Sequence, residues 1–291
     1  MIKRGLYTAL ITPFTKSGEV DEVKLRELVE EQVNAGVAGV VPCGSTGESP
    51  TLNYEEHEKV ISITIDQVKG RCEVMAGTGS NSTHEAIDIT RHAKQAGATC
   101  ALVIVPYYNK PTQHGIYEHF KAVAEAVDLP IVIYNIKGRT GVNLETPTLV
   151  ELTKIPNIIG VKEASGSIEQ MMEVIHETPD NFIVFSGDDK LTMPFMAAGG
   201  DGCVSVASNV IPKRMVNFIN YGLQNDFVAM REEHYKLFPM FRELFVETNP
   251  IPIKTMMSLL GKCENSLRLP LTAGSQTCVE KMKQLIEMYC T

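Results

Sequence analysis

The stretch IIGVKEAS, residues 158–165, places a lysine at the end of an apolar run. Such a run is typical of a strand buried on both faces, where an ammonium group is seldom found. Lys162 there can form an imine with a ketone or aldehyde, provided that its amine is neutral, and a dry strand favours the neutral form. The alternatives are a lysine that binds phosphate and a structural lysine paired with Glu163 or a loop carboxylate. Glu163 is a poor partner, because neighbouring strand residues point to opposite faces.

Three other polar groups follow apolar runs. Tyr134 ends the preceding run, and its phenol can move protons during imine formation. In CGSTGES, Ser45 and Thr46 add hydroxyls to a glycine-rich turn whose N–H groups suit a carboxylate, and no G-K-[ST] follows as in a P-loop. Arg139 in YNIKGRTG can hold a second carboxylate with two hydrogen bonds. The alternatives are that Tyr134 only packs and that Arg139 bonds backbone carbonyls.

Apolar, β-branched runs alternate with amphipathic segments along most of the chain. The runs cover residues 6–14, 38–45, 72–79, 99–108, 129–136, 158–165, 182–189 and 201–208. Strands that are apolar on both faces and alternate with helices predict a parallel sheet, and eight such units predict a closed (β/α)8 TIM barrel. An open, doubly wound sheet is the alternative, although no G-x-G-x-x-G follows the first run.

The barrel would bring the carboxyl ends of all strands, and thus these polar groups, to one face. After about residue 222 only helical patterns remain. We therefore predict a catalytic barrel over residues 1–222 and a C-terminal helical region over residues 223–291.

Composition excludes several classes of function. The net charge of −8 is spread along the 291 residues without charged blocks, which argues against nucleic-acid and membrane partners. No run of 18 apolar residues and no signal peptide is present, so a cytoplasmic location is expected. The seven cysteines form no C-x-x-C pair and are expected to be reduced. There is no H-E-x-x-H motif, and no metal or organic cofactor is expected.

Motifs over essentially the whole chain resemble those of the dihydrodipicolinate synthases, within the pyruvate-dependent class I aldolases that include N-acetylneuraminate lyase. The motifs are TALITPF, GSTGES, AGTGSNST, PYYNKPTQHGIYEHF, YNIKGRTG, GVKEASG, SGDD, NPIPIK and LRLPLT, in that order. The resemblance implies condensation of pyruvate with aspartate semialdehyde, the first committed step of diaminopimelate and lysine biosynthesis.

The resemblance also assigns catalytic roles. It implies an imine on Lys162, and a proton relay made of Tyr134, Thr46 and Tyr108. Tyr108 would reach the site of a neighbouring subunit, which implies a homotetramer built as a dimer of dimers.

Substrate-binding roles follow in the same way. Ser45 and Thr46 match the site for the pyruvate carboxylate, and Val206 and Gly187 match the pyruvate pocket. Arg139 matches the residue that orients the relay and the semialdehyde carboxylate.

A second site implied by the resemblance binds L-lysine as an inhibitor at the dimer interface. The matching positions are Ser49, Pro50, Leu52, Tyr54, His57, Asn81, Glu85 and Tyr107. Glu85 suits an ammonium group, and Asn81 suits the polar head of an amino acid.

Two other functions stay open at this point. One is a sibling aldolase or lyase that acts on a sialic or sugar keto acid, and Lys137, where the synthases usually have proline, leaves room for a different substrate preference. The arginine at 139 and the KEASG motif favour the synthase. The other is a catalytically silent barrel that binds a metabolite.

Overall fold

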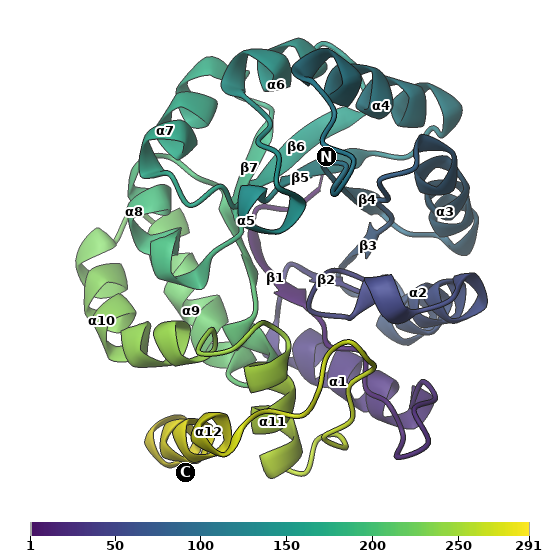
Figure 1. Cartoon of the computed structure of the whole chain (residues 1–291). Helices are drawn as coiled ribbons and strands as arrows, with labels where there is room; N and C mark the ends of the chain where they lie inside the picture. Colours follow the sequence, from purple (N-terminus) through teal and green to yellow (C-terminus); the bar gives the residue numbers. More distant parts are fainter. Residues whose placement is uncertain (1, 291) are drawn as a thin grey trace.

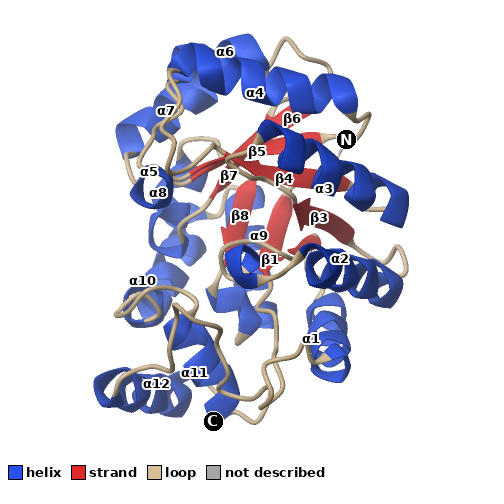
Figure 2. Ribbon diagram, turned by 45° about the vertical axis from the view of Figure 1, so that its right-hand side comes forward, coloured by secondary structure: helices blue, strands red, loops and turns tan. Residues whose placement is uncertain are grey.

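The computed structural model describes residues 2–290 and contains a closed barrel of parallel strands (Figures 1 and 2). The strands are β1 (Gly5–Ala9), β2 (Gly39–Val41), β3 (Glu73–Gly77), β4 (Cys100–Ile104), β5 (Ile131–Asn135), β6 (Ile158–Glu163), β7 (Ile183–Ser186) and β8 (Gly202–Ser205). Each strand pairs with its neighbours in sequence, and β8 pairs with β1. The predicted (β/α)8 barrel is confirmed, and the open sheet is excluded.

Helices surround the barrel and extend it at the C-terminal end. They are α1 (Glu22–Ala35), α2 (Tyr54–Val68), α3 (Thr83–Ala96), α4 (Gln113–Ala126), α5 (Lys137–Thr140), α6 (Thr146–Leu152), α7 (Ile168–Glu177), α8 (Thr192–Ala197), α9 (Pro212–Leu223), α10 (Phe227–Glu243), α11 (Ile251–Leu259) and α12 (Gln276–Tyr289). Short 3₁₀ helices cover Ser49–Thr51, Asp189–Leu191 and Ala207–Asn209. Figure 1 shows α11 and α12 gathered on the side of the barrel that also carries α1.

Local sequence signals explain where several of these helices begin and end. Asp21, Asn53 and Ser82 accept hydrogen bonds from backbone N–H groups in the first turns of α1, α2 and α3. Gly36 ends α1 in the left-handed conformation, with φ of 83°. These ends fix the lengths of the helices, and so where each chain segment returns to the barrel.

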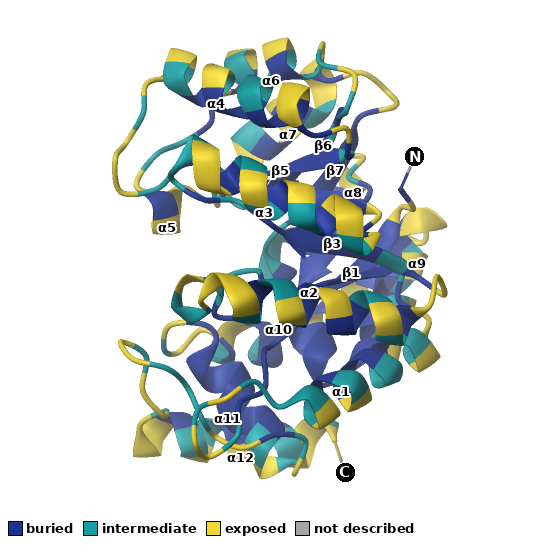
Figure 3. Cartoon of the chain, turned by 90° about the vertical axis from the view of Figure 1, so that its right-hand side faces the viewer, coloured by how far each residue is buried: buried dark blue, intermediate teal, exposed yellow. Residues whose placement is uncertain are grey.

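Two apolar cores hold the elements together. Tyr7, Met75 and Phe185 belong to the core inside the barrel, while Phe218 and Met256 belong to the shell between the barrel and its helices. Figure 3 shows buried residues facing inward on the outer helices and exposed residues facing out. The shell runs without a break into α10, α11 and α12, so the division at residue 222 stays a prediction, although α9 ends at Leu223.

All seven cysteines are free, and six of them are buried. Within residues 2–290, no helix combines the length and the apolar character that a membrane span requires. The cytoplasmic location stays a prediction.

Candidate active site

Lys162 and Tyr134 face each other at the carboxyl ends of β6 and β5. The two residues are register partners across the parallel strands. The Lys162 Nζ atom lies 3.8 Å from the centroid of the Tyr134 ring, and each residue is only 6% exposed. The structure therefore brings together the predicted nucleophile and the predicted proton carrier.

Lys162 is not paired with its neighbour Glu163. The Glu163 carboxylate accepts hydrogen bonds from Asn135 Nδ2 at 3.0 Å and from the Ser165 backbone N–H at 2.6 Å. Burial raises the pKa of Glu163. Among the described residues, no carboxylate forms an ion pair with Lys162. The structural alternative for this lysine, an ion pair with Glu163, is excluded.

Gly187 makes room for the Lys162 side chain. A Cβ atom at position 187 would lie 2.6 Å from Ala164 Cβ, closer than real Cβ contacts come, and 3.0 Å from Lys162 Cε, which is a tight contact. A larger residue at this position would clash with Ala164 and press on the end of the Lys162 side chain. Gly187, predicted as a substrate-binding residue, thus has a clear steric role beside the nucleophile.

The turn between β2 and α2 holds its two hydroxyls in different surroundings. Thr46 is buried, and its Oγ1 accepts a hydrogen bond of 2.9 Å from the side-chain amide of Asn249. Ser45 is half-buried and lines a cavity that Tyr134 also lines. Asn249 belongs to the loop between α10 and α11, so the C-terminal region reaches the site.

Arg139 is exposed on the short helix α5, at the rim of the same cavity. Its Nη2 donates a hydrogen bond of 2.8 Å to the backbone carbonyl of Asn249. A hydrogen bond to a backbone carbonyl is what the sequence analysis gave as the alternative role of Arg139. A guanidinium has five N–H donors, so this bond leaves most of them free for a ligand carboxylate.

A buried ion pair connects α11 to the turn between β2 and α2 that carries Ser45 and Thr46. Lys254 on α11 donates to Glu48 Oε1 at 2.6 Å, and both side chains are fully buried. The backbone N–H of Arg268 donates to the other Glu48 oxygen at 3.1 Å. Sequence reasoning missed this pair and Asn249, whose motif NPIPIK appeared only as part of the resemblance.

Asp189 fixes the end of β8, where Val206 lies. Its Oδ2 accepts backbone N–H bonds from Val206 and Ala207, both at 3.0 Å. Burial raises the pKa of Asp189, against the hydrogen bonds that favour its ionised form. Val206 is buried and is not among the residues that line the cavity described below, so its place in the pyruvate pocket stays a prediction.

The cavity has a volume of about 530 Å³ and extends from the site toward α2 and α3. Most of the residues predicted to bind L-lysine line it: Ser49, Pro50, Leu52, Tyr54, His57, Glu85 and Tyr107. Asn81 is not among the residues that line it; its carbonyl accepts a hydrogen bond from Asn109. Of the residues predicted for catalysis and substrate binding, Ser45, Tyr134 and Arg139 also line it, whereas Lys162, Thr46, Gly187 and Val206 do not.

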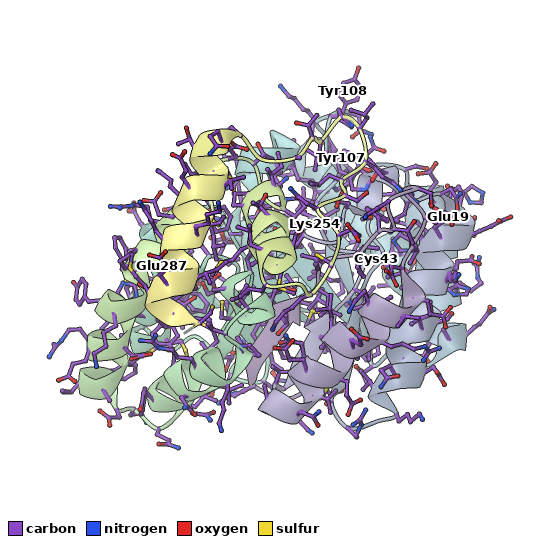
Figure 4. All side chains as sticks on the ribbon, turned by 90° about the horizontal axis from the view of Figure 1, so that it is seen from below. Glu19, Cys43, Tyr107, Tyr108, Lys254 and Glu287 are labelled. Carbon is purple, nitrogen blue, oxygen red and sulfur yellow. The ribbon has the colours of Figure 1, made fainter. Side chains whose placement is uncertain are left out.

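Tyr108 stands apart from the site of its own chain. It is 87% exposed and does not line the cavity. Its φ of 71° is unusual for a residue with a side chain. In Figure 4, Tyr108 lies at the upper edge of the molecule and points outward, Tyr107 lies below it, and Lys254 lies further from that edge.

Among residues 2–290, no three histidine, cysteine, aspartate or glutamate side chains converge in a way that could hold a metal ion. The predicted site brings together the amine of Lys162, the phenol of Tyr134 and the hydroxyls of Ser45 and Thr46 at the carboxyl ends of the strands. A (β/α)8 barrel with such a lysine at a strand end has the arrangement of a lyase that works through an imine.

Comparison with known proteins gives the family. The model of the dihydrodipicolinate synthetase family matches residues 3–289. The chain belongs to this family and is a lyase. It is 50% identical over 286 residues to the 4-hydroxy-tetrahydrodipicolinate synthase of Syntrophus aciditrophicus, and the matched residues cover 98% of each chain.

Solved structures of two further relatives have the same fold. The dihydrodipicolinate synthase from Acinetobacter baumannii complexed with pyruvate gives a TM-score of 0.97 at 40% identity, covering 100% of this chain and 99% of that one. The enzyme from Cyanidioschyzon merolae with lysine bound gives a TM-score of 0.96 at 39% identity, covering 99% of this chain and 98% of that one.

Proposed function

We propose that the chain is a 4-hydroxy-tetrahydrodipicolinate synthase that condenses pyruvate with aspartate semialdehyde through an imine on Lys162. The observation that carries the proposal is the contact between Lys162 Nζ and the Tyr134 ring, 3.8 Å apart. A relative of the same fold has been solved with pyruvate. The product enters diaminopimelate and lysine biosynthesis.

Each step assigns a task to a side chain. Lys162 attacks the C2 carbonyl of pyruvate, and the carbinolamine loses water to give the imine. A methyl proton then leaves, and the enamine carbon attacks the aldehyde of the second substrate. The amino group of that substrate attacks C2 and displaces Lys162, which closes the ring. Tyr134 is close enough to exchange protons with the amine.

The two carboxylates are assigned to separate groups. Ser45 and Thr46 donate to the carboxylate of pyruvate, and Gly187 and Val206 bound the space for its methyl group. Arg139 binds the carboxylate of the semialdehyde at the rim. Because Ser45 lines the cavity together with Tyr134, whereas the Thr46 hydroxyl is held by Asn249, we assign the relay hydroxyl to Ser45 in place of the predicted Thr46, which keeps its predicted role at the carboxylate of pyruvate.

The relay is completed by a second copy of the chain. We propose that Tyr108 enters the site of a neighbouring subunit, within a homotetramer built as a dimer of dimers. The exposure of Tyr108 in a single chain, 87%, supports this role. Sedimentation of the purified protein tests it: tetramers are expected, and a fully active monomer would contradict it.

The direct test of function is turnover. Pyruvate and aspartate semialdehyde should be consumed together, while N-acetylneuraminate should not be cleaved. Cleavage of the sialic acid with no condensation would place the chain among the sibling lyases. Neither reaction, and no covalent adduct with pyruvate, would favour the silent barrel.

We further propose that L-lysine inhibits the enzyme from the outer part of the cavity. Glu85, whose carboxylate accepts from Ser80 Oγ at 2.7 Å, is exposed beside Tyr54 and can pair with an ammonium group. A relative of the same fold has been solved with lysine bound. Inhibition by L-lysine should weaken in Glu85→Gln; unchanged turnover at millimolar L-lysine would contradict the proposal.

A further inference from the structure

Asn249 forms hydrogen bonds with two residues of the candidate site, Thr46 and Arg139. Its side-chain amide donates to Thr46 Oγ1 at 2.9 Å, and its backbone carbonyl accepts from Arg139 Nη2 at 2.8 Å. The residue is 5% exposed and lines the cavity, and its Oδ1 atom has no hydrogen-bond partner among the described residues. The amide nitrogen thus has a hydrogen-bond partner, whereas the buried amide oxygen has none. A buried polar atom without a partner calls for an explanation.

The hydrogen bond to Thr46 sets the direction of the threonine proton. A hydroxyl has one proton to donate and two lone pairs that accept. Since Asn249 Nδ2 can only donate, it occupies one lone pair of Thr46 Oγ1 and leaves the Thr46 proton for another partner. A carboxylate can only accept, so it is the partner that this arrangement suits.

We propose that Asn249 is a positioning residue that holds the Thr46 hydroxyl as a hydrogen-bond donor to the carboxylate of pyruvate. The inference rests on the proposed function. It adds a residue that acts through Thr46 and does not touch the reacting atoms.

The segment that carries Asn249 is anchored at a second point, which makes the geometry rigid. Lys254, five residues further on, forms its fully buried ion pair with Glu48, two residues after Thr46. Thr46 and Glu48 are therefore held by Asn249 and Lys254 from the same segment. A fixed donor costs little reorganisation when the substrate binds.

Asn249→Asp is the sharpest substitution, because it keeps the shape and reverses the hydrogen bond. An ionised aspartate only accepts, so it draws the Thr46 proton to itself and places a negative charge near the bound carboxylate. The KM for pyruvate should rise on the order of 10- to 100-fold, as expected for a lost hydrogen bond to a charged group. Asn249→Ala should raise it less, since it removes the bond without reversing it.

The KM for aspartate semialdehyde should change little in either variant, because the bond from Arg139 goes to the backbone carbonyl. The penalty in Asn249→Asp should also shrink as the pH falls, since a protonated acid can donate to Thr46 as the amide does. A residue that only holds the fold would give neither signature.

Asn157→Asp provides a matched control. Asn157 directly precedes β6, at the end of the strand opposite to Lys162. Its Nδ2 donates to the carbonyls of Ala124 and Val127. The same substitution there should leave the KM for pyruvate unchanged.

A double variant separates the two residues if Asn249→Asp proves poorly folded. Thr46→Val removes the hydroxyl, so adding Asn249→Ala to it should cause no further rise in the KM for pyruvate. Equal and additive effects of the two substitutions, or a wild-type KM for pyruvate in a folded Asn249→Asp, would overturn the inference. A wild-type chain that forms no adduct with pyruvate would instead overturn the proposed function, and this inference with it.

Discussion

Two lysines are buried in this molecule, and their surroundings differ in one respect that decides what each can do. Lys254 is fully buried and lies 2.6 Å from the Glu48 carboxylate. Lys162 is 6% exposed and faces the ring of Tyr134, with no carboxylate in ion-pair distance among the described residues. Lys254 is thus held in an ion pair, whereas the Lys162 amine is not held by a carboxylate.

The elements that carry the two lysines explain the difference. Lys162 ends a barrel strand, so it points to the face where the loops form a cavity. Lys254 is on α11, outside the barrel, where its ion pair with Glu48 holds the turn after Thr46. The Lys254 Nζ also lies over the ring of Phe14, 4.2 Å from its centroid. Burial of Lys254 lowers its pKa, and the Glu48 carboxylate acts against that shift. We therefore assign the proposed imine chemistry to Lys162 and a structural role to Lys254.

The largest effect is expected for Lys162→Ala. Loss of the nucleophile should lower kcat for the condensation by roughly 10⁴-fold or more, because no other described side chain in the site can form the imine. Steady-state assays of pyruvate and semialdehyde consumption measure it. Turnover within tenfold of the wild type would show that the reaction does not pass through this lysine.

Lys254→Met should act on stability. It leaves the Glu48 carboxylate buried without its partner, and we expect the free energy of unfolding to fall by roughly 3–5 kcal/mol. Urea denaturation measures it. The double variant Glu48→Gln, Lys254→Met serves as the control and should lose less than the two single variants together. A loss below about 1 kcal/mol in Lys254→Met would mean that the pair does not stabilise the fold.

Tyr134→Phe keeps the ring over Lys162 and removes the phenolic proton. The kcat should fall by roughly 10²-fold or more, the effect of a lost general acid or base. The fold should be retained, because Tyr134 packs inside the barrel through its ring. Near-normal turnover would assign the proton transfers to another group.

The smallest effect concerns His57, a buried histidine without a carboxylate partner among the described residues. Burial lowers the pKa of His57 from 6.5 to about 4, so the folded state binds fewer protons than the unfolded state at mildly acidic pH. Its contribution to stability is present above pH 6.5 and is lost as the pH falls toward 4.

Between pH 6.5 and 5 this histidine should account for about 1.5 kcal/mol of lost stability. His57→Gln, which stays neutral, should flatten the pH dependence of the unfolding free energy by that amount. Identical slopes in the variant and the wild type would show that His57 is protonated equally in both states.

The barrel, and the place of Lys162 beside Tyr134 at one end of it, could be predicted from the sequence for a local reason. Strand and helix patterns repeat along the chain, and residues at the ends of consecutive strands become neighbours once the barrel closes. Tyr134 and Lys162 are paired by this rule alone. The predicted turn with Ser45 and Thr46 also lies at the expected face.

The contacts that Asn249 and Lys254 make with the turn after β2 could not be predicted from any local pattern. Asn249 and Thr46 are 203 residues apart, and Lys254 and Glu48 are 206 apart. From the sequence, Lys254 is one charged residue in a predicted helix, and nothing nearby indicates that it will be buried. The role of Tyr108 was implied only by the resemblance and stays a prediction, because a single chain leaves its side chain exposed.

Borohydride reduction in the presence of pyruvate, followed by mass spectrometry of the intact chain and its peptides, tests the contrast between the two lysines most directly. We predict one reduced pyruvyl group per chain, carried by Lys162, lost in Lys162→Ala and never found on Lys254. An unmodified wild-type chain, or a pyruvyl group on another residue, would contradict the assignment of Lys162 as the reactive lysine.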